Sequence, residues 1–98
     1  MAERVRYLLA YDIRDKRRLR RVHQVAKDWG YPLQYSVFVC DLTRSELLMM
    51  KNDLSEEMSV VQDSVGIFDL GPPDGRGIRC VEFIGTSREL PDGDAEVW

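Results

Sequence analysis

Residues 5–12 read VRYLLAYD, and this stretch limits how the rest of the chain can be arranged. Successive side chains in a strand point to opposite faces. The odd-numbered positions are all apolar or aromatic, and only Arg6 and Asp12 among the even-numbered ones are charged. The sequence therefore predicts a strand that is largely apolar on both faces and needs cover on both.

Two amphipathic helices are predicted after this strand. Asp15 is a typical N-cap for a helix over about residues 16–29, which Gly30 and the following proline end. Thr43 and Glu46 form a capping-box pattern, which predicts a second helix to about Met58.

The remaining apolar runs predict strands. Residues 33–42 form a run that bends near 34–36, residues 63–70 a second and residues 78–84 a third, with a Pro- and Gly-rich loop at 71–77. This order predicts an α+β fold: a ferredoxin-like βαββαβ sandwich with an extra C-terminal strand over residues 1–86, followed by an acidic tail over 87–98. Both helices would cover one sheet face, so we expect the open apolar face to form a twofold homodimer.

Charge is divided unevenly along the 98 residues. The net charge of −3 combines +5 over residues 1–40 with −8 over residues 41–98. Such asymmetry is typical of a basic binding surface with an acidic remainder, although helices with ordinary charged faces also produce it.

Several classes of protein are excluded or disfavoured. Cys40 and Cys80 are too few for a disulfide scaffold, and with His23 they cannot complete a structural zinc site, so buried reduced thiols are expected. The glycine-rich loop lacks a Walker sequence, and no strand carries an RNA-recognition motif. With no apolar run long enough for a membrane and charges in the first fifteen residues, we expect a cytoplasmic protein without membrane contact.

Asp12 is the candidate for metal chemistry. It ends the first strand just before a basic helix, where a carboxylate could hold a divalent ion over a phosphate, or could simply start a turn. One carboxylate is a poor magnesium site, and a twofold dimer would bring a second Asp12 to the axis.

The basic helix supplies candidates for phosphate contact. Arg17, Arg20 and Arg21 are predicted to form a solvated fan, whereas Arg18 falls within the apolar arc and could reach along the sheet end toward Asp12. A simply solvated helix face is the alternative.

Three aromatic residues, Tyr11, Tyr35 and Phe38, could stack on bases, although aromatic residues at alternate strand positions are more often core or interface. His23 is expected to be a partly buried structural histidine.

Four strings resemble the Cas2 family of CRISPR-associated proteins in order and spacing: YLLAYDI at 7–13, KRRLRRV at 16–22, QYSVFVCDL at 34–42 and DSVGIF at 63–68. The resemblance implies a ferredoxin-like homodimer in which each C-terminal strand completes the partner's sheet. It also implies that Asp12 and its symmetry mate bind Mg²⁺ for phosphodiester hydrolysis of single-stranded RNA or double-stranded DNA.

The resemblance assigns further roles residue by residue. It implies nucleic-acid contacts at Arg17, Arg18, Arg21 and Ser36, and roles in shaping the site for Tyr11 and Phe38. In the family the dimer bridges two dimers of the Cas1 integrase during spacer acquisition, so a non-catalytic DNA-binding scaffold is an alternative to an endonuclease.

The chain departs from the family pattern in two places. Gly66 stands where the family often has arginine, and loop 71–77 is longer and richer in Pro and Gly than expected. A ligand-sensing ferredoxin-like regulatory domain is a further alternative, which the arginine cluster disfavours.

Overall fold

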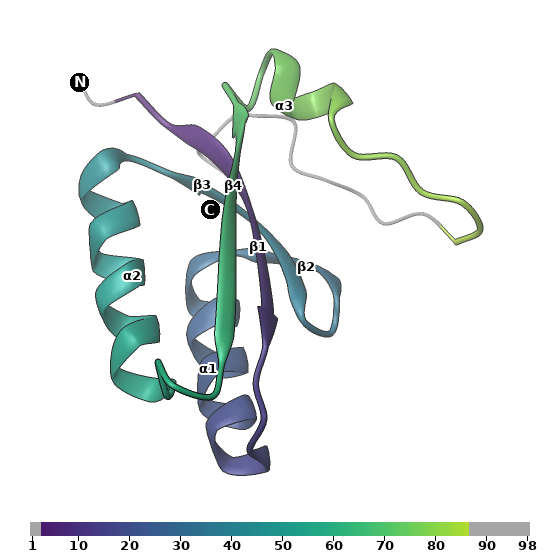
Figure 1. Ribbon diagram of the computed structural model, residues 1–98. Helices are drawn as coiled ribbons and strands as arrows, with labels where there is room; N and C mark the ends of the chain where they lie inside the picture. Colours follow the sequence, from purple (N-terminus) through teal and green to yellow (C-terminus); the bar gives the residue numbers. More distant parts are fainter. Residues whose placement is uncertain (1–2, 87–98) are drawn as a thin grey trace.

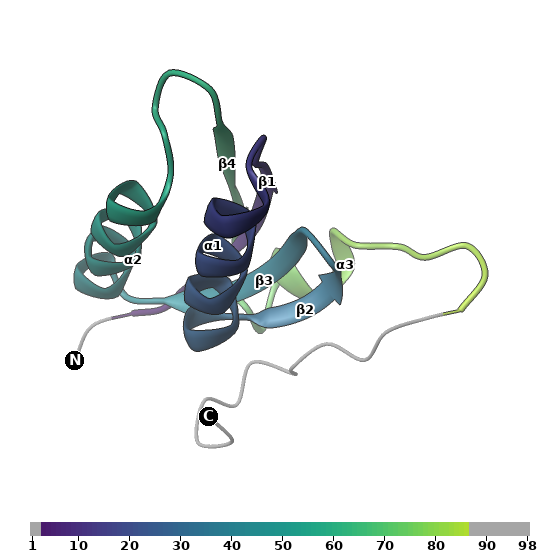
Figure 2. The same cartoon turned by 90° about the horizontal axis from the view of Figure 1, so that it is seen from below.

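The computed structural model describes residues 3–86, apart from the side chains of Ile78 and Arg79. Its elements follow in the order β1 (Val5–Asp12), α1 (Lys16–Trp29), β2 (Tyr31–Gln34), β3 (Val37–Leu42), α2 (Arg44–Glu57), β4 (Ser64–Gly71) and α3 (Arg76–Arg79). The strands form one antiparallel sheet in the order β2-β3-β1-β4. Helices α1 and α2 lie side by side on one face and α3 lies on the other (Figures 1 and 2). The predicted α+β βαββαβ arrangement is confirmed.

The helix boundaries follow from their caps. The Asp15 carboxylate accepts a hydrogen bond from the Arg18 backbone N–H at the start of α1, and Thr43 and Glu46 form the predicted capping box at the start of α2. Gly30 ends α1 where the chain passes close to β3, because a Cβ there would lie 2.6 Å from Cys40 Sγ.

The core lies between the helices and the inner sheet face. Its fully buried members come from β1, α1, β3 and α2: Leu9, Val22, Ala26, Phe38, Cys40 and Met50. Burial raises the pKa of the Cys40 thiol to about 12, so the thiol stays protonated, and Cys80 is also a free cysteine. Burial of the thiol is therefore confirmed for Cys40, whereas Cys80 is only half-buried.

The opposite sheet face, which we call the outer face, is divided into two halves. At one end Arg6 and Asp41 form a bidentate ion pair, with both Nε–Oδ1 and Nη2–Oδ2 at 2.8 Å, and both side chains are buried. Helix α3 packs over this pair, since a Cβ on Gly77 would lie 3.2 Å from Arg6 Cβ. Toward the other end, Leu8 is only half-buried and Phe68 is 54% exposed.

The predicted strand over residues 78–84 is wrong for this single chain. Residues 76–79 form α3, and the segment from 80 to 86 pairs with no strand among the described residues. The strand-forming residues Ile, Val and Phe are present in this segment, but a strand needs an edge with which to pair, and residues 71–75 lead the chain into α3 over the outer face instead. The predicted acidic tail over 87–98 lies outside the described residues.

Candidate nucleic-acid interface

Asp12 lies in an open depression on the exposed half of the outer face. The depression has a volume of about 280 Å³ and is lined by residues of β1 and β4, namely Ala10, Tyr11, Asp12, Ser64, Gly66 and Phe68. Asp12 is exposed, and within residues 3–86 its carboxylate forms no hydrogen bond or ion pair. The carboxylate is therefore available to a ligand from solvent.

Gly66 shapes this depression through the side chain it lacks. A Cβ at this position would lie 3.0 Å from the ring of Phe68 and would push that ring away. Where an arginine would have added a cation to the strand, the ring of Phe68 instead lies against Gly66, two residues from Asp12's cross-strand partner, Ser64. This departure makes the depression less basic and more apolar.

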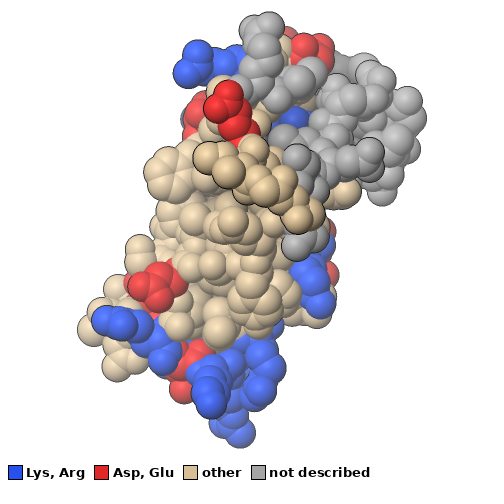
Figure 3. All heavy atoms as spheres, turned by 90° about the vertical axis from the view of Figure 1, so that its right-hand side faces the viewer, with Lys and Arg blue, Asp and Glu red and all other residues tan. Residues whose placement is uncertain are grey.

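The exposed cations gather next to Asp12 in the chain. Lys16, Arg17, Arg20 and Arg21 are all exposed on the first turns of α1. Figure 3 shows the side of the molecule on which α3 lies, and the middle of this face carries no charged side chains. Lys and Arg side chains gather at its lower end, which is the end where α1 begins in Figure 1. Cations near a helix N-terminus are opposed by the helix dipole, so the cluster does not stabilise α1 and is instead suited to a bound anion.

Arg18 does not belong to this exposed group. Its Nε lies 2.8 Å from Asp63 Oδ2, its Nη2 lies 2.9 Å from Gln62 Oε1, and its side chain is a quarter exposed. The predicted direction of this side chain, toward Asp12, is therefore replaced by an ion pair with the turn before β4. The sequence indicated that Arg18 lies on the apolar side of the helix, but it could not indicate the ion pair, because Asp63 is 45 residues away in the chain.

Asp63 is the residue that organises this end of the molecule. Besides Arg18, its carboxylate accepts hydrogen bonds from the backbone N–H groups of Arg14 and Ser59 at 2.9 and 2.8 Å. The hydrogen bond from Arg18, with those two backbone bonds, holds the pKa of the Asp63 carboxyl well below its usual range. Both carboxylate oxygens of Asp63 accept hydrogen bonds from groups of this chain, so Asp63 has a structural role and is not available as a metal ligand.

Tyr11 and Phe38 are buried on the inner face, 7% and 0% exposed. The Tyr11 hydroxyl lies 2.8 Å from His23 Nδ1 and donates to the Tyr35 carbonyl oxygen at 3.0 Å. Burial, with the neighbouring Tyr35, raises the pKa of Tyr11 to about 12. Both residues therefore support the strand end that carries Asp12, and neither ring is available for stacking on a ligand.

Ser36 lies in the turn between β2 and β3. Its carbonyl oxygen accepts a hydrogen bond from the Tyr11 N–H at 3.2 Å, and the residue is half-buried. The backbone of Ser36 thus joins the β2–β3 hairpin to the end of β1, next to Asp12.

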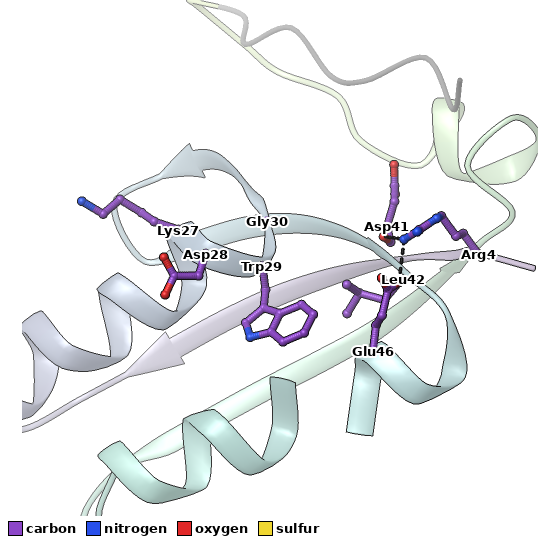
Figure 4. Close-up of a pocket in the computed structure, with 8 residues that line it drawn as sticks. All are labelled: Arg4, Lys27, Asp28, Trp29, Gly30, Asp41, Leu42 and Glu46. Atoms are coloured by element: carbon purple, nitrogen blue, oxygen red, sulfur yellow. Dashed lines mark hydrogen bonds and ion pairs between the residues drawn. The ribbon is translucent and has the colours of Figure 1, made fainter. Parts of the chain in front are cut away.

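A second cavity, of about 290 Å³, lies at the opposite end of β1 and has no counterpart in the sequence predictions. Figure 4 shows Arg4 reaching over it, where Arg4 Nη1 donates to the Asp41 carbonyl oxygen at 3.1 Å and to Glu46 Oε1 at 2.6 Å. Trp29, Lys27 and Asp28 line its other side. Since its arginine is already paired with a glutamate of the same chain, this cavity is less suited to an anion than the end that carries the exposed arginines.

The donor set at Asp12 limits what metal chemistry one chain could support. Among the described residues, no group of three or more His, Cys, Asp or Glu side chains could hold a metal ion. A hydrated Mg²⁺ needs only one or two carboxylates together with water and phosphate oxygens, so the exposed oxygens of Asp12 fit part of such a site.

No helix within residues 3–86 is long and apolar enough to cross a membrane.

Solved structures with the same fold are known. The hypothetical protein TT1823 from Thermus thermophilus superposes with a TM-score of 0.76 at 26% identity, covering 88% of this chain and 96% of that one. Streptococcus pyogenes Cas2 superposes with a TM-score of 0.71 at 30% identity, covering 82% of this chain and 99% of that one.

Sequence comparison agrees with the fold. The chain is 39% identical over 90 residues to CRISPR-associated endoribonuclease Cas2 2 of Thermodesulfovibrio yellowstonii, which covers 92% of this chain and 93% of the relative. It is 33% identical over 91 residues to CRISPR-associated endoribonuclease Cas2 1 of Rhodospirillum rubrum, covering 93% and 88%. The family model described as CRISPR associated protein Cas2 matches residues 5–75. The chain therefore belongs to the Cas2 family of CRISPR-associated proteins.

Proposed function

We propose that this protein acts in CRISPR adaptation as a homodimer that binds nucleic acid and cleaves phosphodiester bonds with Mg²⁺ at paired Asp12 residues. The observation that carries the proposal is the exposed carboxylate of Asp12, which forms no bond to any described residue and precedes a helix that begins with exposed arginines. The curated relatives described above are named endoribonucleases, which supports the same class of reaction.

The homodimer is supported by the incomplete outer face. Leu8, Ala10 and Phe68 leave an apolar surface next to Asp12, and β4 is an edge strand of the sheet. A twofold contact across this surface would cover it and would bring two Asp12 carboxylates toward the axis, so that the second chain supplies the acid that one chain lacks. The segment from 80 to 86 contains the strand-forming residues Val81, Phe83 and Ile84 but pairs with no strand among the described residues, so it is suited to pair with the edge of the other chain's β4.

In this arrangement the residues of the chain have separate tasks. Arg17 and Arg21 hold backbone phosphates, and the Asp12 pair faces the scissile phosphate. The ion pair between Arg18 and Asp63 holds the start of α1 next to the start of β4. The half-buried Ser36 orients the hairpin beside the strand end. A Mg²⁺ ion held by Asp12 would lower the pKa of a coordinated water and neutralise charge on the phosphate.

The test compares two activities in one set of variants. Purified wild type, Asp12→Ala and Asp12→Asn are assayed for Mg²⁺-dependent cleavage of single-stranded RNA and of duplex DNA, with chain mass in solution measured in parallel. Loss of cleavage in both variants, with the dimer retained, supports catalysis at Asp12. Equal cleavage by all three proteins contradicts it.

A scaffold that bridges dimers of the Cas1 integrase is the second candidate, and it is favoured because Asp12 is the one carboxylate among the described residues that line the depression. It requires only the arginine cluster and a dimer of fixed width. In a spacer-integration assay with the cognate integrase, full activity of Asp12→Ala combined with lost activity of Arg17→Ala/Arg21→Ala would support the scaffold alone.

A further inference from the structure

The ring of Tyr35 is one of two largely exposed aromatic rings among the described residues, with that of Phe68. Tyr35 lies in the turn between β2 and β3 and is 58% exposed, whereas Tyr11 at the end of β1 and Phe38 on β3 are buried. Its ring stacks on His23 with centroids 4.3 Å apart and planes 11° apart. One face of the ring is therefore covered, and the exposed remainder includes the other face.

His23 is held firmly beneath Tyr35. The single proton of the Tyr11 hydroxyl is donated to the Tyr35 carbonyl oxygen, so the hydrogen bond between that hydroxyl and His23 must be donated by Nδ1–H. Phe38 packs its ring edge-to-face against His23 at 5.5 Å. Three elements, β1, α1 and β3, thus fix the imidazole plane, and the imidazole fixes the plane of the tyrosine ring.

The surroundings of this stacked pair are basic. On α1, Arg20 and Lys27 lie three residues before and four residues after His23, which places them on the same side of the helix, and both are exposed. The exposed ring of Tyr35 therefore lies next to the side of α1 that carries these cations. The hydrogen bond from the Tyr11 N–H to the Ser36 carbonyl oxygen holds the β2–β3 hairpin beside the end of β1. A rigid aromatic ring beside cations is the arrangement that binds a nucleobase by its face and the flanking phosphates by charge.

We propose that the Tyr35 ring, supported by His23, is a stacking platform for one unpaired nucleobase. This inference rests on the proposed nucleic-acid binding and deepens it: the preferred ligand carries at least one single-stranded nucleotide next to the backbone that the α1 arginines hold. A fully paired duplex would use the arginines without the platform, because its bases are already stacked.

The platform can be tested by binding, without any cleavage. Fluorescence anisotropy is measured in Ca²⁺ buffer for a 12-nucleotide single-stranded RNA, the same sequence as single-stranded DNA, and a blunt duplex. Tyr35→Ala is expected to weaken binding of the single strands about tenfold and leave the duplex and the salt slope unchanged. Tyr35→Phe should bind like the wild type, as should Leu48→Ala, a control with a similarly exposed side chain on α2.

A second measurement reports the stack directly. Oligonucleotides with 2-aminopurine at successive positions should show quenching at one position with wild type and Tyr35→Phe, and none with Tyr35→Ala. An abasic site at that position should weaken binding by the wild type but not by Tyr35→Ala. Comparison of the RNA and DNA strands shows which of the two provides the base.

The outcomes separate this inference from the proposed function. If Tyr35→Ala binds single strands as tightly as the wild type, the platform is wrong while nucleic-acid binding stands. Equal weakening for single strands and duplex would also overturn the platform, since Tyr35 would then act through the hairpin fold, which a thermal melt of Tyr35→Ala would reveal. If the wild type binds no nucleic acid at all, both proposals fail.

Discussion

The two faces of the sheet differ in how much of their cover the chain itself supplies. The inner face is closed by α1 and α2 over fully buried residues such as Leu9 and Phe38. Within residues 3–86, the outer face is closed at one end, where α3 covers the Arg6–Asp41 pair, and is open around Asp12 and Phe68. The chain therefore completes its core on one side and leaves its candidate site on the side that is incomplete.

The largest effect is expected where the outer face is closed. Asp41→Ala removes one partner of a pair whose side chains are 0% and 3% exposed, and leaves the Arg6 guanidinium buried without its carboxylate. Breaking such a pair costs about 3–5 kcal/mol of unfolding free energy. Urea unfolding followed by circular dichroism measures the loss. A loss as small as that of an exposed pair would mean that α3 does not keep the outer face closed in solution.

Two adjacent leucines of β1 compare the faces directly. Leu9→Ala removes a fully buried side chain from the inner face and should cost about 2–5 kcal/mol. Leu8→Ala, its matched control on the outer face, should cost less in a dilute monomer, because Leu8 is only half-buried there.

The proposed dimer makes the Leu8→Ala effect depend on protein concentration. Thermal melts across a hundredfold range of concentration, with mass measured by sedimentation, should show a melting temperature that rises with concentration for the wild type and rises less for Leu8→Ala. A concentration-independent melting temperature for both would count against a dimer across the outer face.

The Arg18–Asp63 pair should make stability depend on pH below about 4. Its partners lower the pKa of Asp63 in the folded state relative to the ordinary value of about 3.9, so the stabilisation is complete above that pH and is lost as the pH falls. Asp63→Asn lacks this contribution. The difference in melting temperature between wild type and Asp63→Asn should therefore be constant near neutral pH and shrink in acid. A difference that is the same at pH 3 and pH 7 would contradict this role.

The smallest effect concerns a helix that covers the inner face. Thr43→Ala removes the side chain that accepts a hydrogen bond from the Glu46 N–H at 3.2 Å, and should lower the unfolding free energy by about 1 kcal/mol. Thr43→Ser, which keeps the hydroxyl, should recover most of the loss in the same urea titration. No difference between the two variants would show that the capping box contributes little to α2.

Most of the fold was predictable because it depends on local patterns. The cap residues Asp15 and Thr43 mark the starts of α1 and α2, and alternation along residues 5–12 assigns each side chain of β1 to its face. The strand predicted over residues 78–84 was wrong because an apolar run of strand-forming residues gives a segment the capacity to form a strand but does not provide the edge with which it pairs.

The candidate site was predictable only in part. The exposure of Asp12, Arg17 and Arg21 could be predicted from their positions in the chain. A charged residue at the end of a strand or outside the apolar side of a helix faces solvent whatever the rest of the fold does. The separation of Arg18 from that group was not predictable, because it depends on Asp63, which reaches α1 only after the whole sheet has formed.

The sequence alone determined the order of elements from β1 to β4, the two apolar faces of β1 and the basic start of α1, because these depend on residues close together in the chain. The tertiary structure decided which arginine is paired, which aromatic ring is exposed and which half of the outer face is closed. These features depend on contacts between residues far apart in the chain, from the 12 positions between His23 and Tyr35 to the 71 between Arg6 and Gly77, and such contacts exist only in the folded protein.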